Sequence, residues 1–330
     1  MLEQHEVAAY LLARGLVTRR SIVRGRLRIA DATSRNRNFR VSGAPGESLL
    51  LKQAIVADSA ESLANEAAIY HRLTTAGGSL AETTPRLHGF DEAHDLLILE
   101  WIDDGVDLYR HHATRARCSA PLARALGRAL ATLHAVAPDD DELRCDAPWV
   151  LSLHRPRLEA LRYLSGASIA LIKAIQRDAP FACALDDLRE GWRVEALIHR
   201  DVKWANCIVT GPAAIVLVDW EMAGWGDPAL DVGSALGEFL GRRLRAGGER
   251  GVPDPAIAAF WRAYGRGGAP AAELLERAVR YAGARLLQSA YEKTQETGLA
   301  HERADCAARL ARDLLLAPQA ATVELLGIAP

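Results

Sequence analysis

The sequence predicts an α+β protein of two lobes, in which a small antiparallel sheet with one main helix precedes a larger, mostly helical part. Strand-like apolar segments crowd into the first hundred or so residues. After the turn "DDG" at residues 103–105, apolar residues recur instead at helical spacing. A chain of 330 residues is long enough for one such two-lobed domain. We therefore expect lobes at residues 1–102 and 103–330.

The first lobe begins with an amphipathic helix over residues 6–14, which Gly15 ends. A second helix, "AESLANEAAIYHRLTT", is bounded by the turn at Gly77 and Gly78. The remaining segments have strand-like patterns, and the last of them forms a hairpin: residues 21–32, 38–43, 48–56 and 86–102. These elements make a small, strand-rich unit with one principal helix.

The second lobe is predicted to be helical except around one polar crossing. Helical patterns cover residues 121–136, 157–164, 168–176, 227–240, 256–265 and 271–295. Between them, the stretch "LIHRDVKWANCIV" has apolar ends that suggest two short buried strands. The turn "TGPAA" then joins "NCIV" to a further strand, "AIVLV".

The composition excludes several classes of protein. The formal charge is −2, from 40 basic and 42 acidic side chains, so no global field would attract nucleic acid or an anionic membrane. The 5 cysteines are scattered without a CxxC pair, which fits reduced thiols better than disulfides or a zinc site. The N-terminus has acidic residues where a signal peptide is basic, and no apolar run could span a bilayer. We expect a soluble, cytoplasmic protein whose oligomeric state the sequence does not indicate.

Two charged residues of the first lobe make sense only as a pair. Lys52 lies among leucines in "SLLLKQAIV", where an ammonium without a partner would be costly. In the next helix, Glu66 lies on the apolar stripe with Leu63, Tyr70 and Leu73, which should face the sheet. A lysine that reaches water from an edge strand, with a glutamate at the margin of its stripe, is the alternative interpretation.

The polar crossing carries the residue types that phosphoryl transfer requires. The hairpin brings the amide of Asn206 and the carboxylate of Asp219 toward one end, and oxygen ligands of this kind suit Mg²⁺. Asp201 lies one loop away, where it can accept a proton from a hydroxyl, and Lys203 can place its charge beside the same group. We interpret His199 as a packing residue that supports the loop. The alternative for the other residues is turn chemistry, because Asp and Asn favour turns.

These residues resemble the aminoglycoside phosphotransferase and choline kinase family, the small-molecule branch of the protein-kinase-like fold. The likeness covers most of the chain, in the same order and spacing: Lys52, Glu66, "LILEWIDDG", "LATLHA", "HRDVKWAN", "VDWEMAG" and "GDPALDVG". The resemblance implies a bilobal protein-kinase-like fold and an enzyme that uses ATP and Mg²⁺.

The resemblance also implies a role for each matching residue. Lys52 would hold the α- and β-phosphates and pair with Glu66, and Asp201 would be the catalytic base. Asn206 and Asp219 would ligate Mg²⁺. The adenine would meet backbone groups of Glu100, Trp101 and Ile102. Asp227 resembles a helix N-cap and Asp231 the family's brace of the catalytic loop, and both are interpreted as structural.

Three departures from the family pattern bear on the prediction. The loop at residues 31–38, "DATSRNRN", has no glycine, so Ser34 and Asn36 either contact the phosphates through their backbone or form an ordinary hairpin tip. Asp219 is followed by Trp220 and Glu221, and Glu221 either joins the metal site or is merely exposed. Finally, Arg200 and Lys203 make the catalytic loop similar to that of a Ser/Thr protein kinase.

The acceptor is predicted to be the hydroxyl of a small metabolite or antibiotic. Between residues 136 and 198 we count eleven acidic and eight basic residues, a small excess for binding a polycation. Four tryptophans lie in segments expected around the acceptor, and each is either a wall of that site or core: Trp149, Trp192, Trp204 and Trp225. Trp204 is the one that the catalytic loop should hold near Asp201.

Two other functions are kept as alternatives. In Lys203 and in the segments "RLLQSAYEK" and "PQAATVELLGI", the chain is similar to phosphotransferases of bacterial peptide-natural-product pathways. Such a kinase would phosphorylate Ser or Thr of a precursor peptide, as in lanthipeptide-like biosynthesis, to prepare elimination. The second alternative is a nucleotide-binding scaffold without catalysis, although none of the metal or base residues is lost here.

Overall fold

The computed structural model describes residues 2–33, 36–43, 48–246, 252–265, 272–299 and 302–328. It contains two compact units: Met1–Leu108 with Asn206–Ala223, and Tyr109–Ala205 with Gly224–Pro330. The lobes predicted at residues 1–102 and 103–330 stay a prediction, and the units differ from them mainly because residues 206–223 group with the first hundred. No helix in the described ranges is long and apolar enough to cross a membrane.

The first unit is built on a five-stranded antiparallel sheet in the order β1-β2-β3-β5-β4. Its strands are β1 (Arg28–Asp31), β2 (Arg37–Ser42), β3 (Leu49–Gln53), β4 (Leu87–Asp91) and β5 (Leu96–Glu100). Alternation along the strands separates two faces. Phe39 and Leu51 face a buried cluster that the N-terminal segment completes with Val7 and Leu11. Lys52 pairs with Asn38 in register and therefore belongs to the opposite face.

The helices of the first unit are α1 (Val7–Ala13), α2 (Arg19–Val23), α3 (Ala57–Ala76) and α4 (Gly78–Glu82), with a short 3₁₀ turn η1 (Glu92–His94). α1 ends before Gly15 and α3 before Gly77, as the sequence predicts. The strand predicted at residues 21–32 begins only at Arg28, because residues 21–23 belong to α2. The Thr18 hydroxyl accepts a hydrogen bond from the Ser21 N–H at 3.1 Å and starts a helix there.

A second sheet in the same unit has the order β6-β8-β9, with β6 (Val106–Asp107), β8 (Cys207–Gly211) and β9 (Ala214–Leu217). β8 and β9 form the predicted antiparallel hairpin. The following 3₁₀ turn η5 (Trp220–Met222) is tied to α3, because the amide of Asn65 donates to the carbonyls of Glu221 and Ala223 at 3.2 and 3.3 Å. This explains why residues 206–223 belong to the first unit.

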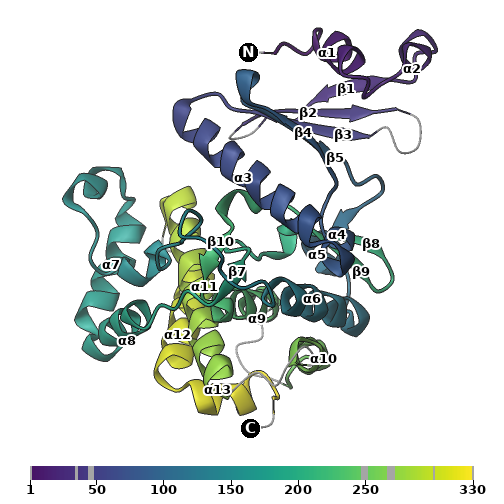
Figure 1. The fold of residues 1–330 in the computed structure, drawn as a ribbon. Helices are drawn as coiled ribbons and strands as arrows, with labels where there is room; N and C mark the ends of the chain where they lie inside the picture. The colour runs from purple at the N-terminus through teal and green to yellow at the C-terminus, as the bar shows by residue number, and fades with distance from the viewer. Residues whose placement is uncertain are drawn as a thin grey trace. The chain divides into compact units, whose positions relative to one another are not determined.

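The second unit is mainly helical (Figure 1). Its helices are α5 (Leu108–Ala113), α6 (Ala120–Leu133), α7 (Gly166–Arg177), α8 (Ala179–Glu190), α9 (Pro228–Arg245), α10 (Pro255–Tyr264), α11 (Ala272–Thr297), α12 (Glu302–Leu316) and α13 (Pro318–Glu324). α6 packs on α10, and α11 packs on both α9 and α12. Gly233 permits the α9–α11 approach, since a Cβ there would lie 2.4 Å from the Ala278 carbonyl oxygen.

Short elements of the second unit lie between these helices. They are the 3₁₀ helices η2 (Trp149–Ser152), η3 (Leu158–Tyr163) and η4 (Trp204–Asn206, of which Asn206 belongs to the first unit), and the antiparallel pair β7 (Ala196–Ile198) and β10 (Gly224–Gly226). The helix predicted at residues 157–164 is thus a 3₁₀ helix. The strand predicted at the start of "LIHRDVKWANCIV" is β7, and it belongs to a different sheet from β8.

Candidate active site

Lys52 on β3 forms the centre of a buried charge cluster in the first unit. Its Nζ donates to both carboxylate oxygens of Glu66, at 2.9 and 3.0 Å, and to Oδ1 of Asp219 at 2.9 Å. Glu66 is fully buried and the Lys52 side chain is 10% exposed, whereas Asp219 keeps 35% of its side chain exposed. The contact predicted between Lys52 and Glu66 is therefore present, and Asp219 is a second partner of the same ammonium.

The protonation of this cluster follows from burial and from its charges. Burial disfavours the Lys52 ammonium, but the carboxylates of Glu66 and Asp219 outweigh it and raise the Lys52 pKa above its ordinary value. Burial raises the pKa of Glu66, and Lys52 partly offsets that increase. Lys52 consequently keeps its positive charge throughout the neutral range.

The backbone places Asn206 beside Asp219. The N–H of Val218, the residue before Asp219, donates to the carbonyl oxygen of Asn206 at 3.0 Å, next to the Cys207–Leu217 pair of the hairpin. Asp219 itself has φ 69° and ψ 63°, in the left-handed region that costs a non-glycine residue free energy. This conformation, held between β9 and η5, is the kind of strain that proteins retain at functional sites.

The chemistry of Asn206 and Asp219 fits a magnesium ion. Both offer oxygen atoms, which Mg²⁺ prefers, and Asp219 is partly accessible. Within the described ranges, no group of three or more His, Cys, Asp or Glu side chains could hold a metal. Mg²⁺ is commonly bound through one or two protein ligands, with water and phosphate completing its shell, so this small oxygen set suits it.

The other nucleotide-binding residues predicted in the first unit are only partly described. Ser34 lies outside the described residues. Asn36 is 6% exposed, and among described residues its amide oxygen has no hydrogen-bond partner. In the segment predicted to meet the adenine, the N–H groups of Glu100 and Trp101 already donate to the carbonyls of Arg86 and Ser48, at 2.8 and 2.9 Å.

Ile102 is consequently the remaining N–H donor of that segment. Hydrogen bonds within the described part of the chain do not involve it. The two preceding N–H groups are committed to the sheet and its loop. The sequence could not make this distinction, because it depends on which strands lie beside residue 100.

Asp201 and Lys203 lie together in the second unit. The Nζ of Lys203 donates to Oδ2 of Asp201 at 2.6 Å, and their side chains remain 25–34% exposed. His199 is fully buried and its Nδ1 accepts the Asp201 N–H at 3.4 Å. This position agrees with the interpretation of His199 as a packing residue that supports the loop.

Asp231, fully buried in the first turn of α9, holds the backbone of the loop. Its carboxylate accepts the N–H groups of His199 and Arg200 at 2.7 and 2.8 Å. Arg200 has φ 68°, so these bonds stabilise a left-handed residue directly before Asp201. His134 adds a third contact, 3.2 Å from Asp231, and joins it to the Tyr264 hydroxyl at 3.0 Å. His134 belongs to the predicted "LATLHA" segment, but its role was not predicted.

The four tryptophans expected near the acceptor have different environments. Trp204 and Trp225 are 1% exposed. Trp204 packs against His112 and Phe239, so of the two alternatives for this ring, acceptor wall or core, the structure shows core. Trp192 is half-buried, with its Nε1–H on the Cys145 carbonyl at 2.9 Å. Trp149 is 50% exposed.

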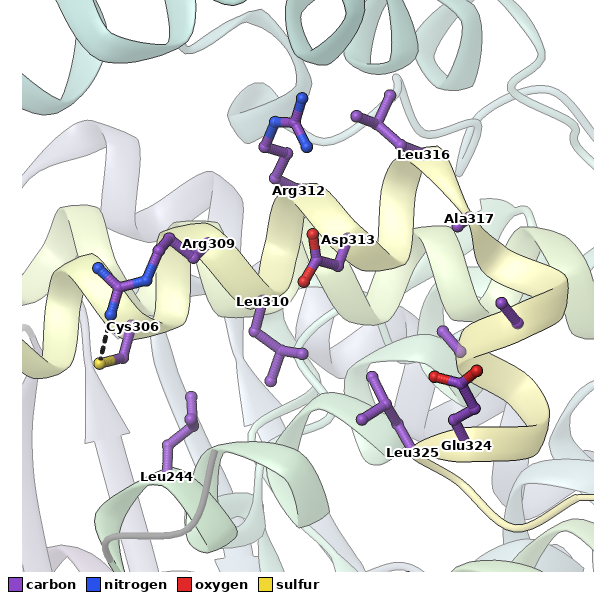
Figure 2. A pocket seen from close by; sticks show the side chains of 12 residues that line it. Leu244, Cys306, Arg309, Leu310, Arg312, Asp313, Leu316, Ala317, Glu324 and Leu325 are labelled. Atoms are coloured by element: carbon purple, nitrogen blue, oxygen red, sulfur yellow. Dashed lines mark hydrogen bonds between the residues drawn. The ribbon is translucent and has the colours of Figure 1, made fainter. Parts of the chain in front are cut away.

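Two cavities of the second unit lie away from these residues. One, of about 460 Å³, lies along α12 and α13, where Leu310 and Leu325 line it beside Cys306 and Arg309 (Figure 2). The other, of about 340 Å³, lies between α9 and α11. Neither cavity is lined by a predicted catalytic, nucleotide-binding or metal-binding residue, so we do not assign the reaction to them.

Comparison with known proteins connects the fold to one family. The model of the phosphotransferase enzyme family matches residues 26–275. An ADP-bound aminoglycoside phosphotransferase is similar in fold, with a TM-score of 0.60, 14% identity, and coverage of 96% of this chain and 100% of that one. Choline kinase from Streptococcus pneumoniae has a TM-score of 0.54, 13% identity, and coverage of 92% and 99%.

A macrolide 2′-phosphotransferase from Brachybacterium faecium is similar as well, with a TM-score of 0.53, 19% identity, and coverage of 93% and 98%. At these identities the likeness establishes the fold alone. A search of curated protein sequences finds no match. The predicted α+β fold class is confirmed.

Proposed function

Because the chain belongs to the phosphotransferase enzyme family, we propose that it transfers the γ-phosphate of ATP, with Mg²⁺, to a hydroxyl group of a small metabolite or antibiotic. Membership of this family confirms the resemblance stated from the sequence, and with it the predicted enzyme class. The nucleotide, the metal and the acceptor are the proposed part. Similar folds belong to kinases of choline, an aminoglycoside and a macrolide, and one of these structures contains ADP.

The first unit carries the groups for the nucleotide. Lys52, held by Glu66, would bind the α- and β-phosphates through an ammonium that stays charged. Asn206 and Asp219 would hold Mg²⁺, which supplies positive charge against the phosphate oxygens when it is bound. The Ile102 N–H would bind the purine, with Glu100 and Trp101 shaping the same segment. Asn36 would contact the phosphates from the first unit.

The second unit carries the groups for the hydroxyl. Asp201 would accept the proton of the attacking hydroxyl, because its carboxylate is partly exposed on a loop that Asp231 fixes. Lys203, 2.6 Å from that carboxylate, would stabilise negative charge that develops nearby.

The observation that carries the proposal is the Lys52 cluster, in which one ammonium meets both Glu66 and Asp219. An ion pair kept only for stability would gain little from burying these charges. The test is Asp201→Asn, which removes the base and keeps its size. We expect kcat to fall by about 10²–10⁴-fold with nucleotide affinity unchanged. Asp305→Asn, at an exposed position of α12, is the control and should change neither.

Two measurements test the proposed function. Phosphotransfer is measured across a broad panel of hydroxyl compounds, and nucleotide binding is followed by thermal shift. Retained kcat in Asp201→Asn would refute the base assignment. Absence of both nucleotide binding and transfer would refute the proposal as a whole.

One observation supports the alternative that the acceptor is a peptide. The Nζ of Lys203 lies 2.6 Å from Oδ2 of Asp201, and the resemblance to the peptide phosphotransferases depends on this lysine. Mass spectrometry of co-expressed precursor peptides would show added phosphate or loss of water if the acceptor were a Ser or Thr side chain. A scaffold without catalysis would instead bind nucleotide and show no rate that Asp201→Asn could reduce.

A further inference from the structure

The 3₁₀ turn η5, which follows Asp219 directly, is held by one side chain of α3. The half-buried amide of Asn65 donates two hydrogen bonds, to the carbonyl oxygens of Glu221 at 3.2 Å and of Ala223 at 3.3 Å. Both acceptors are backbone groups, two residues apart, so the bonds restrain the course of the chain itself. The residues assigned above to the nucleotide, the metal and the acceptor do not include Asn65.

Asp219 has a backbone conformation that must be restrained from both sides. Its φ of 69° and ψ of 63° lie in the left-handed region, which costs an aspartate free energy and persists only where neighbouring contacts hold it. On the side before Asp219, the Val218 N–H donates to the Asn206 carbonyl at 3.0 Å. On the side after it, the two hydrogen bonds of Asn65 restrain the chain.

The side of α3 that carries Asn65 holds the turn through two further contacts. Ser62, three residues earlier on the helix, donates from its hydroxyl to the Glu221 carboxylate at 3.4 Å. Glu66, the next residue after Asn65, accepts the N–H of the first η5 residue at 3.3 Å. Glu66 also accepts the hydrogen bonds of the lysine on β3. The same helix therefore restrains both this lysine and the turn after the proposed metal ligand.

We propose that Asn65 is a positioning residue for the metal site, which acts through the backbone of η5 to keep Asp219 in the conformation that presents its carboxylate to Mg²⁺. This inference rests on the proposed function, in which Asp219 is a metal ligand. The Asp219 carboxylate lies 2.9 Å from the Lys52 Nζ and stays 35% exposed, which leaves it accessible to a cation. Without the two bonds of Asn65, the chain after Asp219 relaxes from the left-handed conformation and the carboxylate moves with it.

A contribution to stability alone is the competing explanation. An amide that joins a helix to a carbonyl of another segment stabilises a protein wherever it occurs. Gln176 of α7 supplies such a case in the second unit, because its amide donates to the His154 carbonyl at 2.8 Å. Substitution by leucine removes the donor at either position and keeps a side chain of similar size. Comparison of the two leucine variants therefore separates an effect on the metal site from a general effect on stability.

The first experiment measures binding of Mn²⁺, a paramagnetic substitute for Mg²⁺, to the full-length protein with ADP by electron paramagnetic resonance. We expect Asn65→Leu to raise the Mn²⁺ dissociation constant about 10-fold, as is typical when a group that orients a metal ligand is removed. Gln176→Leu should leave it unchanged. Ser62→Ala should change it by less than about 2-fold, because the long bond of Ser62 ends on a side chain and not on the backbone.

ADP affinity measured without metal should be the same in all these variants. Asn65→Ala should behave as Asn65→Leu does, and it takes the place of that variant if urea denaturation shows Asn65→Leu to be unfolded. Equal Mn²⁺ affinity in the wild type and in the folded Asn65 variant overturns the inference. Failure of the proposed metal site appears differently, because the wild type itself then binds no Mn²⁺ with ADP, and the inference falls with it.

The second experiment requires neither metal nor acceptor. Hydrogen exchange of peptides that cover residues 218–223, followed by mass spectrometry on the metal-free protein, reports how freely the η5 backbone opens. We expect exchange about 10-fold faster in Asn65→Leu than in the wild type, and no change in Gln176→Leu. Unchanged exchange in Asn65→Leu overturns the inference. Faster exchange with unchanged Mn²⁺ affinity overturns it as well, because Asn65 would then hold η5 for stability alone.

Discussion

Asp231 offers the sharpest test of how the catalytic loop is held. In Asp231→Ala the N–H groups of His199 and Arg200 lose the carboxylate that accepts them at 2.7 and 2.8 Å. Each buried N–H without a partner costs about 1–3 kcal/mol. The left-handed conformation of Arg200, at φ 68°, also loses its restraint and can relax. We therefore expect the free energy of unfolding to fall by about 3–5 kcal/mol.

The loss of activity should exceed what unfolding explains. Because Arg200 directly precedes Asp201, relaxation of its backbone displaces the proposed base, and a displacement of about 1 Å can cost about 10²-fold in rate. The assay combines urea denaturation with kcat measured where the variant remains folded. Asp254→Ala is the matched control, since Asp254 also accepts two backbone N–H groups, of Cys118 and Ala256, each at 3.0 Å.

Asp254→Ala should therefore cost about 1–2 kcal/mol of stability and leave kcat unchanged, because it caps a helix away from the loop. If Asp231→Ala loses no more stability than Asp254→Ala, the two hydrogen bonds do not hold the loop. If it loses stability but keeps full kcat, Asp231 does not position Asp201.

Two further predictions concern the core of the second unit. His112 is 2% exposed, its Nε2 accepts the Ser119 N–H at 3.0 Å, and burial and then neighbouring positive groups lower its pKa from 6.5 to about 4. Since the folded pKa is depressed, the contribution of neutral His112 to stability is full above about pH 6.5 and is lost as pH falls toward 4. Relative to His112→Gln, the free energy of unfolding should fall by about 2–3 kcal/mol over that range, measured by urea titrations at each pH. Parallel pH profiles of the two proteins would contradict this. Gly233→Ala should lower the free energy of unfolding by about 1–3 kcal/mol, because the new Cβ would lie 2.4 Å from the Ala278 carbonyl oxygen. This cost should exceed the gain from the better helix propensity of alanine. An unchanged melting temperature would show that α9 and α11 can separate freely.

Most helices of the chain could be predicted, because their signals are local. α1 and α3 end where Gly15 and Gly77 permit a positive φ, and α9 begins at Asp227 and Pro228, as expected for an N-cap and N1. The helix α2 was missed because its pattern, "RRSIV", has only five residues and two β-branched ones, and a capping bond from Thr18 decides it. The helices α8, α12 and α13 were missed, since their apolar stripes are short or rich in alanine.

The residues of the candidate site could likewise be predicted only where their signals are local in the sequence. Asp201, Lys203 and Asn206 could be found because they lie within one short motif, so chain connectivity alone keeps them close. Glu66 could be found because helical periodicity places it on the buried stripe. The second contact of Lys52, to Asp219, spans 167 residues of sequence, and no spacing rule predicts its geometry. The same holds for His134, whose bond to Asp231 spans 97 residues.

By itself, the sequence determined the α+β class, the residues of the catalytic motif and the pairing of a buried lysine with a glutamate. The motif residues lie close together in the chain, and the other two follow from periodicity and from the cost of burying an unpaired charge. Only the tertiary structure decided which aromatic rings face water. Trp204 is core and Trp149 is exposed, although both lie beside polar segments, because burial depends on neighbours that distant parts of the chain supply.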